Sequence, residues 1–175
     1  MDKLLNQLKI PVHSNTYLKD PESSTLGKKI VKGSIELIDE IGFENFNFKK
    51  VAHSIDSTEA SVYRYFESKH KLLLYLTNWY WAWLEYKLVF RVTNVDSPKE
   101  RLERALSVLI EDVKQDGNFD HINEVKLNGI VINDSSKTYL TKEVDKENKE
   151  GIFKAYKQLV QRVSDIIQEI NPTFK

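Results

Sequence analysis

The chain has 175 residues, of which 41% are hydrophobic, 11% aromatic and 30% charged, as in ordinary globular proteins. Basic and acidic side chains balance at 26 each, which excludes a general basic coat for nucleic acid but leaves a local basic patch open. The absence of cysteine excludes a disulfide framework, a cysteine-ligated metal and a thiol nucleophile. Its longest apolar runs, residues 72–76 and 79–84, are far shorter than the ~20 residues of a membrane span, and we find no signal-peptide pattern. We therefore expect a soluble cytoplasmic protein with no membrane partner.

The first half of the chain predicts an irregular arm followed by four helices. Residues 1–24 contain two prolines and a polar stretch and are expected to form the arm. Gly42 is placed to end the first helix, while Asn47 and Ser68 are placed to cap the second and the fourth. The apolar spacing predicts these helices at about residues 26–41, 48–55, 59–66 and 69–92.

The second half is also predicted to be helical. Ser97 and Pro98 begin a capping box whose helix is expected to end at Gly117. Residues 119–132 mix helix and strand character and are predicted as helix, and the most regular apolar pattern covers residues 152–170. Residues 145–151 carry no apolar side chain and are either a loop or a solvated turn of a longer helix. The fold class is therefore all-α.

A short helix, a tight turn and another short helix at residues 48–66 form the helix-turn-helix arrangement, in which the second helix enters the DNA major groove. With Val62 at the centre of the buried face, the third helix directs small, hydroxyl, phenol and guanidinium side chains outward. Such side chains allow close approach to base edges and hydrogen bonding to bases or phosphates. The outward set, together with the cap residue of the turn, is Thr58, Ala60, Ser61, Tyr63 and Arg64.

Charge supports this interpretation only mildly. Residues 46–72 hold five basic and three acidic side chains, a net charge of +2. Lys69 lies in the first turn of the fourth helix, where the free backbone amides already favour a phosphate. The case for DNA binding therefore depends on geometry more than on net charge.

The same segment resembles the DNA-binding domain of TetR-family transcriptional regulators. The resemblance covers about residues 26–73 and is carried by three runs, Ile38-Asp-Glu-Ile-Gly-Phe-Glu-Asn-Phe46, Val51-Ala52 and Ser61-Val-Tyr-Arg-Tyr-Phe-Glu-Ser-Lys-His-Lys-Leu-Leu73. It implies a homodimeric regulator that binds a double-stranded DNA operator. Its expected organisation is an arm at residues 1–24, a three-helix helix-turn-helix DNA-binding domain at residues 25–72 and a larger helical ligand-binding and dimerisation domain at residues 73–175.

The resemblance also assigns roles to individual residues. It implies groove contacts for Ser61, Tyr63 and Tyr65, a phosphate contact for Lys69 and a backbone contact for Lys49. The sequence departs from the family pattern at Asp56, where a turn glycine is usual, and at Glu59, where a basic or neutral residue is common.

Each of these roles has a structural alternative. Tyr65 is equally well explained as a core aromatic of the three-helix unit, and Lys49 and Lys69 as solvated charges. The arm is expected to be disordered, the alternative being that its lysines reach DNA; they are Lys3, Lys9 and Lys19.

The long fourth helix is unusually aromatic. The structural interpretation is that its rings pack the core, and the functional one is that some of them line a pocket for a small apolar or aromatic effector of unknown identity. The candidate effector-binding residues are Trp79, Tyr80, Trp83 and Tyr86. The last helix, residues 152–170, is likewise either core or dimer interface.

No motif supports catalysis, so we expect no enzyme activity, no cofactor and no metal site. Glu67-x-x-His70 has the spacing of a di-iron motif, but it occurs once where two copies and two further carboxylates are required. The sequence thus favours a transcriptional regulator, more specifically a repressor. The alternative is a helical adaptor or small-molecule-binding protein with a non-functional helix-turn-helix head.

Overall fold

A computed structural model describes residues 9–174, and within this range the regular structure consists of helices alone. The all-α prediction is confirmed. The elements are the 3-10 helices η1 (Ser14–Thr16) and η2 (Pro21–Ser23) and the α-helices α2 (Thr25–Asn45), α3 (Phe48–Ser54), α4 (Glu59–Tyr63), α5 (Lys69–Val92), α6 (Pro98–Ile110), α7 (Glu124–Asn133), α8 (Ser135–Tyr139), α9 (Val144–Lys149) and α10 (Lys154–Ile170).

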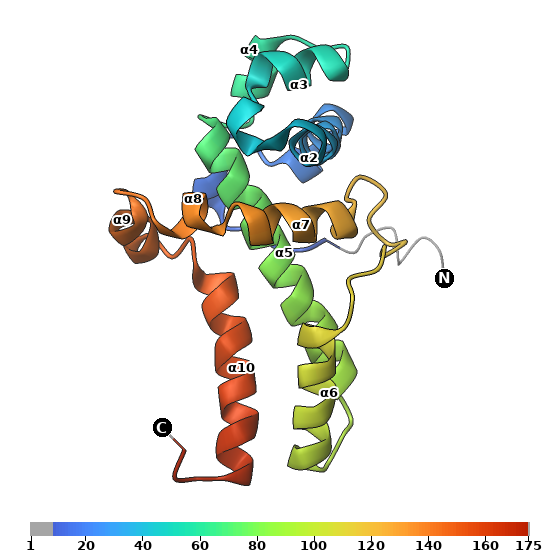
Figure 1. Ribbon diagram of the computed structural model, residues 1–175, viewed down its shortest axis with the longest axis vertical. Coiled ribbons are helices and arrows are strands. Elements are labelled where there is room, and N and C mark those ends of the chain that lie inside the picture. The colour runs from blue at the N-terminus through green and yellow to red at the C-terminus, as the bar shows by residue number, and fades with distance from the viewer. Residues whose placement is uncertain (1–8, 175) are drawn as a thin grey trace.

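Helices α2, α3 and α4 gather at one end of the elongated molecule and are called the head (Figure 1). Helix α5 runs from the head into the remaining helices, called the body, where it packs with α6 and α10. Helix α7 crosses between the two parts and packs against both α2 and α5. Because α5 is continuous across residues 72 and 73, head and body share one rigid element.

The predicted starts of α3, α4 and α5 are confirmed, whereas α2 continues past Gly42 and α4 ends at Tyr63, short of the predicted residue 66. Asn47 accepts a hydrogen bond from the Lys50 amide at 2.9 Å, and Ser68 accepts one from the Lys71 amide at 3.2 Å. Gly42 takes a φ of 77°, the left-handed conformation that glycine adopts without strain, so α2 has a kink there and runs three residues further.

The second half departs from the sequence prediction at several places. Residues 144–149 form the separate helix α9, with Glu147 buried, where a loop or a solvated turn was expected, and α10 begins at Lys154 instead of residue 152. Helix α6 begins at Pro98 as expected but ends at Ile110, because Glu111 is extended, with a ψ of 150°, and its carboxylate is 3.5 Å from Lys87 Nζ on α5. The predicted continuation to Gly117 is therefore wrong. Helix α7 begins only after Asn123, so residues 119–123, which were predicted to be helical, do not belong to the helix.

The described part of the arm is ordered, and the expectation of disorder is wrong for residues 9–24. Ile10 is buried, the Leu18 amide donates to the Tyr65 carbonyl at 2.7 Å, and Tyr17 packs edge-on against Tyr75 at 6.1 Å between ring centroids. Lys3 lies outside the described residues. The arm therefore connects the end of the head to α5.

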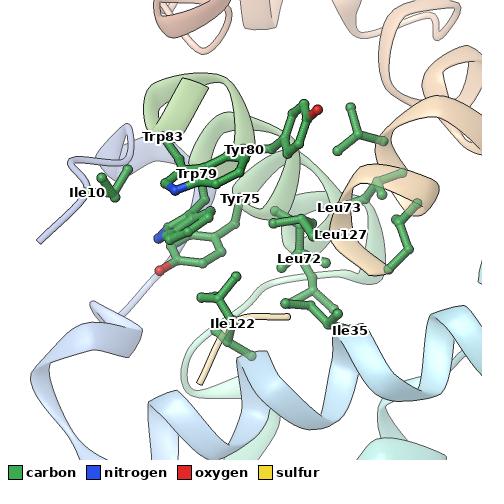
Figure 2. Packing of buried hydrophobic residues seen from close by; sticks show 14 of the residues in the cluster. Ile10, Ile35, Leu72, Leu73, Tyr75, Trp79, Tyr80, Trp83, Ile122 and Leu127 are labelled. Atoms are coloured by element: carbon green, nitrogen blue, oxygen red, sulfur yellow. The ribbon is translucent and has the colours of Figure 1, made fainter. Parts of the chain in front are cut away.

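The core follows α5 from the head into the body, as Figure 2 shows for its aromatic and aliphatic side chains. Trp79 and Trp83 stack with their ring centroids 6.2 Å apart, and Leu72 and Leu73 face Leu127 of α7 and Ile35 of α2. No helix within residues 9–174 has both the length and the apolar character needed to cross a bilayer.

One carboxylate is buried in this core and predicts a pH-dependent stability. Glu124 is 0% exposed, and its Oε2 accepts a hydrogen bond from the Asp116 amide at 3.1 Å. Burial raises the pKa of Glu124 from 4.5 to about 7. The folded state thus holds this proton more tightly than the unfolded chain does. The contribution of protonated Glu124 to the free energy of unfolding is therefore full below about pH 4.5 and is lost as pH rises to about 7.

We expect Glu124→Gln to remove this dependence. The glutamine side chain keeps an oxygen that accepts from the Asp116 amide and carries no charge. Between pH 4.5 and 8 the free energy of unfolding of the variant should therefore rise relative to that of the wild type by on the order of 3 kcal/mol. Urea unfolding at the two pH values measures the gain. An equal difference between the two proteins at both pH values would contradict it.

Candidate nucleic-acid interface

The turn between α3 and α4 is closed by local hydrogen bonds. Asp56 takes a φ of 53°, the left-handed conformation expected where the family pattern has glycine, and Ser57 donates its amide to the Ala52 carbonyl at 2.8 Å. Thr58 caps α4 through Oγ1, which accepts from the Ser61 amide at 3.2 Å. Val62, 0% exposed, anchors α4 in the head.

The outer side of α4 is open to solvent. Thr58, Ala60 and Arg64 are exposed, and Ser61 is half-buried, with its hydroxyl 2.9 Å from that of Thr58. Tyr63 is 48% exposed, and one side of its ring packs edge-on against Phe48 of α3, with centroids 4.9 Å apart. The outward set predicted from the sequence is thus exposed or half-buried on the outer side of α4 and in the turn before it.

Lys49 extends this surface to the start of α3. Its side chain is exposed, whereas the neighbouring Lys50 Nζ donates to the Asn45 carbonyl at 2.7 Å. Lys49 directly follows Phe48, whose ring packs against Tyr63, so an exposed cation lies on the helix next to α4.

Tyr65 does not belong to this surface, and the groove contact implied for it is wrong for this structure. Its side chain is 1% exposed, and its hydroxyl is 2.7 Å from Ser24 Oγ at the start of α2. That contact and the nearby Lys19 lower the pKa of Tyr65 despite its burial. The core alternative is the one the structure supports, because the ring joins the arm to the head.

The Lys69 ammonium is also bound by groups within the protein. Its Nζ lies 3.2, 3.4 and 3.3 Å from the carbonyl oxygens of Phe43, Glu44 and Phe46, and 4.8 Å from the centre of the Phe43 ring. These carbonyls close the kinked end of α2, where free acceptors and the helix dipole favour a cation. We therefore assign Lys69 to the C-terminus of α2 in place of the phosphate contact implied by the resemblance.

The two lysines give a matched prediction. We expect Lys69→Met, which keeps much of the aliphatic stem but loses the charge, to lower the free energy of unfolding by about 1–2 kcal/mol. It should leave the salt dependence of DNA affinity unchanged. Lys49→Met should leave the unfolding free energy unchanged and lower the slope of log affinity against log salt by about one. Denaturant unfolding and DNA titrations over a range of salt concentrations measure both, and exchanged results would reverse the two assignments.

The candidate effector residues are mostly core. Trp79 and Trp83 are at most 1% exposed, and the Trp83 Nε1 donates to Asp116 Oδ2 at 3.1 Å. Tyr80 is 5% exposed and donates its hydroxyl to Asn128 Oδ1 of α7 at 2.6 Å, whereas Tyr86 is half-buried. In this conformation the packing interpretation holds for both tryptophans.

Sequence reasoning missed the residues that position this site. Ser24 holds Tyr65, and Phe43 receives Lys69 on both its carbonyl and its ring. These partners lie 41 and 26 residues apart in the sequence, so no helical spacing connects them. The one local signal was Ser24 itself, because a serine before an apolar helical pattern is a typical N-cap.

A capped short helix, a closed turn and a second short helix with an exposed polar face define a helix-turn-helix DNA-binding domain. Residues 30–76 match the family model described as "Bacterial regulatory proteins, tetR family". This segment of the chain is therefore similar in sequence to the DNA-binding domain of TetR-family regulators.

A curated relative is also described as a helix-turn-helix regulator. The chain is 26% identical over 92 residues to YuxN of Bacillus subtilis (strain 168), described as an uncharacterized HTH-type transcriptional regulator. The matched segment covers 53% of this chain and 32% of the relative, so the chain spans about a third of that protein. No solved structure gives a significant match to the chain.

Proposed function

We propose that the protein is a sequence-specific transcriptional repressor that binds a palindromic operator as a homodimer and is released by a small apolar or aromatic effector. Residues 25–72 would bind DNA, and residues 73–175 would bind the effector and form the dimer. Such a regulator would act on DNA in the cytoplasm.

The observation that carries the proposal is the two-sided character of α4. Val62 is fully buried on one side, while Ala60, Tyr63 and Arg64 are exposed on the other. A helix held on its inner side with small and hydrogen-bonding residues outside fits the requirements of major-groove contact.

The homodimer is supported by apolar side chains on the body. Leu106, Leu109 and Ile110 of α6 are 42%, 38% and 82% exposed, and Tyr156 and Val160 of α10 are 41% and 50% exposed. A second copy of the chain covering such surface would remove it from water. Two heads in one dimer would present two copies of α4 to successive major grooves about 34 Å apart.

Release by an effector is supported by the shared helix α5. A ligand that separated the aromatic side chains between α5 and α7 would break the bond from Tyr80 to Asn128 and shift α7, which also packs against α2 of the head. A coupling of ~1–3 kcal/mol would change operator affinity by roughly 5–150-fold.

Selection of bound sequences from a pool of random duplex DNA tests the proposal. The expected product is an inverted repeat with half-sites about one helical turn apart, accompanied by a dimer mass in solution. Recovery of a single half-site with a monomer mass would contradict the homodimer. Failure to enrich any sequence would contradict the regulator and favour the adaptor with a non-functional head.

A further inference from the structure

A small hollow lies between the N-terminal arm and α5, away from the exposed face of α4. Its volume is about 240 Å³, and it combines apolar, aromatic and charged side chains. Those that matter for recognition are Lys9, Ile10, Tyr17, Asp20, Glu22 and Tyr75.

Tyr75 supplies a buried polar group at the hollow. The residue is 1% exposed, and its hydroxyl makes no hydrogen bond of normal geometry within residues 9–174, although the Glu22 side chain lies close to it. Figure 2 shows the ring beside Trp79, with the hydroxyl at the edge of the cluster, next to the ribbon of the arm. Burial raises the pKa of Tyr75 well above 10, and the negative charges of Glu22 and Asp20 raise it further, so the hydroxyl stays neutral.

The hollow offers two carboxylates to a cation, and both of them are already paired within the protein. Asp20 and Glu22 contribute two carboxylates, and Lys9 contributes one ammonium. Glu22 is shared with neighbours, because its Oε1 is 2.6 Å from His121 Nε2 and its Oε2 is 3.9 Å from Lys28 Nζ. Asp20 accepts from its neighbour, the Glu22 amide, at 3.0 Å and pairs through Oδ2 with Lys9.

The pair between Lys9 and Asp20 shows which ligand chemistry the hollow accepts. Asp20 already binds an ammonium group, and the side chain of Lys9 is 51% exposed, so exchange for an external ammonium costs little. The rings of Tyr17 and Tyr75 meet edge-on at 76° beside this carboxylate. Aromatic rings and a carboxylate around an apolar hollow are the features that bind organic cations.

We propose that this hollow is a binding site for a small organic ammonium compound, whose cationic group replaces Lys9 on Asp20 and whose apolar part lies against Ile10 and the two tyrosine rings. The site is separate from the effector region between α5 and α7. Any effect of this site on DNA affinity rests on the proposed function. The existence of the binding site itself does not depend on that function.

A ligand at this site would act on a segment that supports the head. Asp20 caps η2 by accepting from the Glu22 amide, and the arm on either side of it holds Tyr65 through the Leu18 amide and Ser24 Oγ. Occupancy that holds the arm in place would therefore stabilise the end of the head near Tyr65.

Choline and its neutral isostere 3,3-dimethylbutan-1-ol provide a direct test, with binding to the full chain measured by calorimetry in the absence of DNA. Choline is expected to bind at least tenfold more tightly than the isostere, because only choline carries the charge. Asp20→Asn should weaken choline binding at least tenfold, and Lys9→Ala should strengthen it several-fold by removing the internal competitor. Asp120→Asn, a matched change at an exposed position, should leave it unchanged.

Equal affinity for choline and the isostere, or weaker choline binding by Lys9→Ala, would overturn the proposal. Circular dichroism establishes that Asp20→Asn is folded, and the Lys9→Ala result decides the question if it is not. Choline binding without enrichment of any DNA sequence would leave the site standing and contradict the regulator alone.

Discussion

Tyr63→Ala is expected to weaken operator binding by roughly 5–150-fold, since a good contact to a base contributes about 1–3 kcal/mol. The side chain is 48% exposed on the outer face of α4, between Ala60 and the exposed Arg64. Its ring is held by Phe48 of α3, which fixes its direction before DNA arrives. A titration of the selected operator, followed by fluorescence anisotropy, measures the loss.

Two controls separate contact from folding. Phe174→Ala removes an aromatic ring of similar exposure, 43%, in the segment that follows α10, and should leave affinity unchanged. Helix α10 ends at the opposite end of the molecule from the head (Figure 1). The circular dichroism spectrum of Tyr63→Ala should match that of the wild type. Unchanged operator affinity in folded Tyr63→Ala would remove this residue from the interface.

Trp83→Ala is expected to lower the free energy of unfolding by about 3–5 kcal/mol, as truncation of a buried tryptophan leaves a cavity. Trp83 is 0% exposed, stacks on Trp79 and carries Lys87 Nζ 4.6 Å from its ring centre. The change also leaves Asp116 Oδ2 without its indole donor. Urea unfolding measures the loss.

Phe90→Ala on the same helix serves as the matched control. This ring is 77% exposed, so its removal should change the unfolding free energy far less than the loss of Trp83. A Trp83→Ala protein of wild-type stability with an altered ligand response would favour the effector-pocket interpretation over the core.

Local signals predicted the helices of the head because capping acts between neighbours. Asn47 and Ser68 each accept a hydrogen bond from an amide three residues later, and Gly42 and Asp56 take the left-handed conformations that their positions suggested. The outward direction of Ala60, Tyr63 and Arg64 followed from helical geometry with Val62 inside. These features depend on a few consecutive residues, so the sequence was sufficient.

Contacts between distant segments could not be predicted in this way. Tyr65 lies just beyond α4, where helical geometry no longer sets its direction, and the arm covers it through Leu18 and Ser24. Lys69 turns towards the carbonyls of α2 because the kink at Gly42 brings them within reach. The family resemblance implied a DNA contact for Tyr65 and for Lys69, but the packing of this chain places both side chains against the protein.

Methylation interference on the selected operator tests the central claim, that the outer face of α4 enters the major groove. Methyl groups at guanine N7 lie in the major groove, and those at adenine N3 lie in the minor groove. We expect N7 methylation to block binding in two patches about 10 base pairs apart. Interference confined to adenine N3, or spread without such patches, would contradict it.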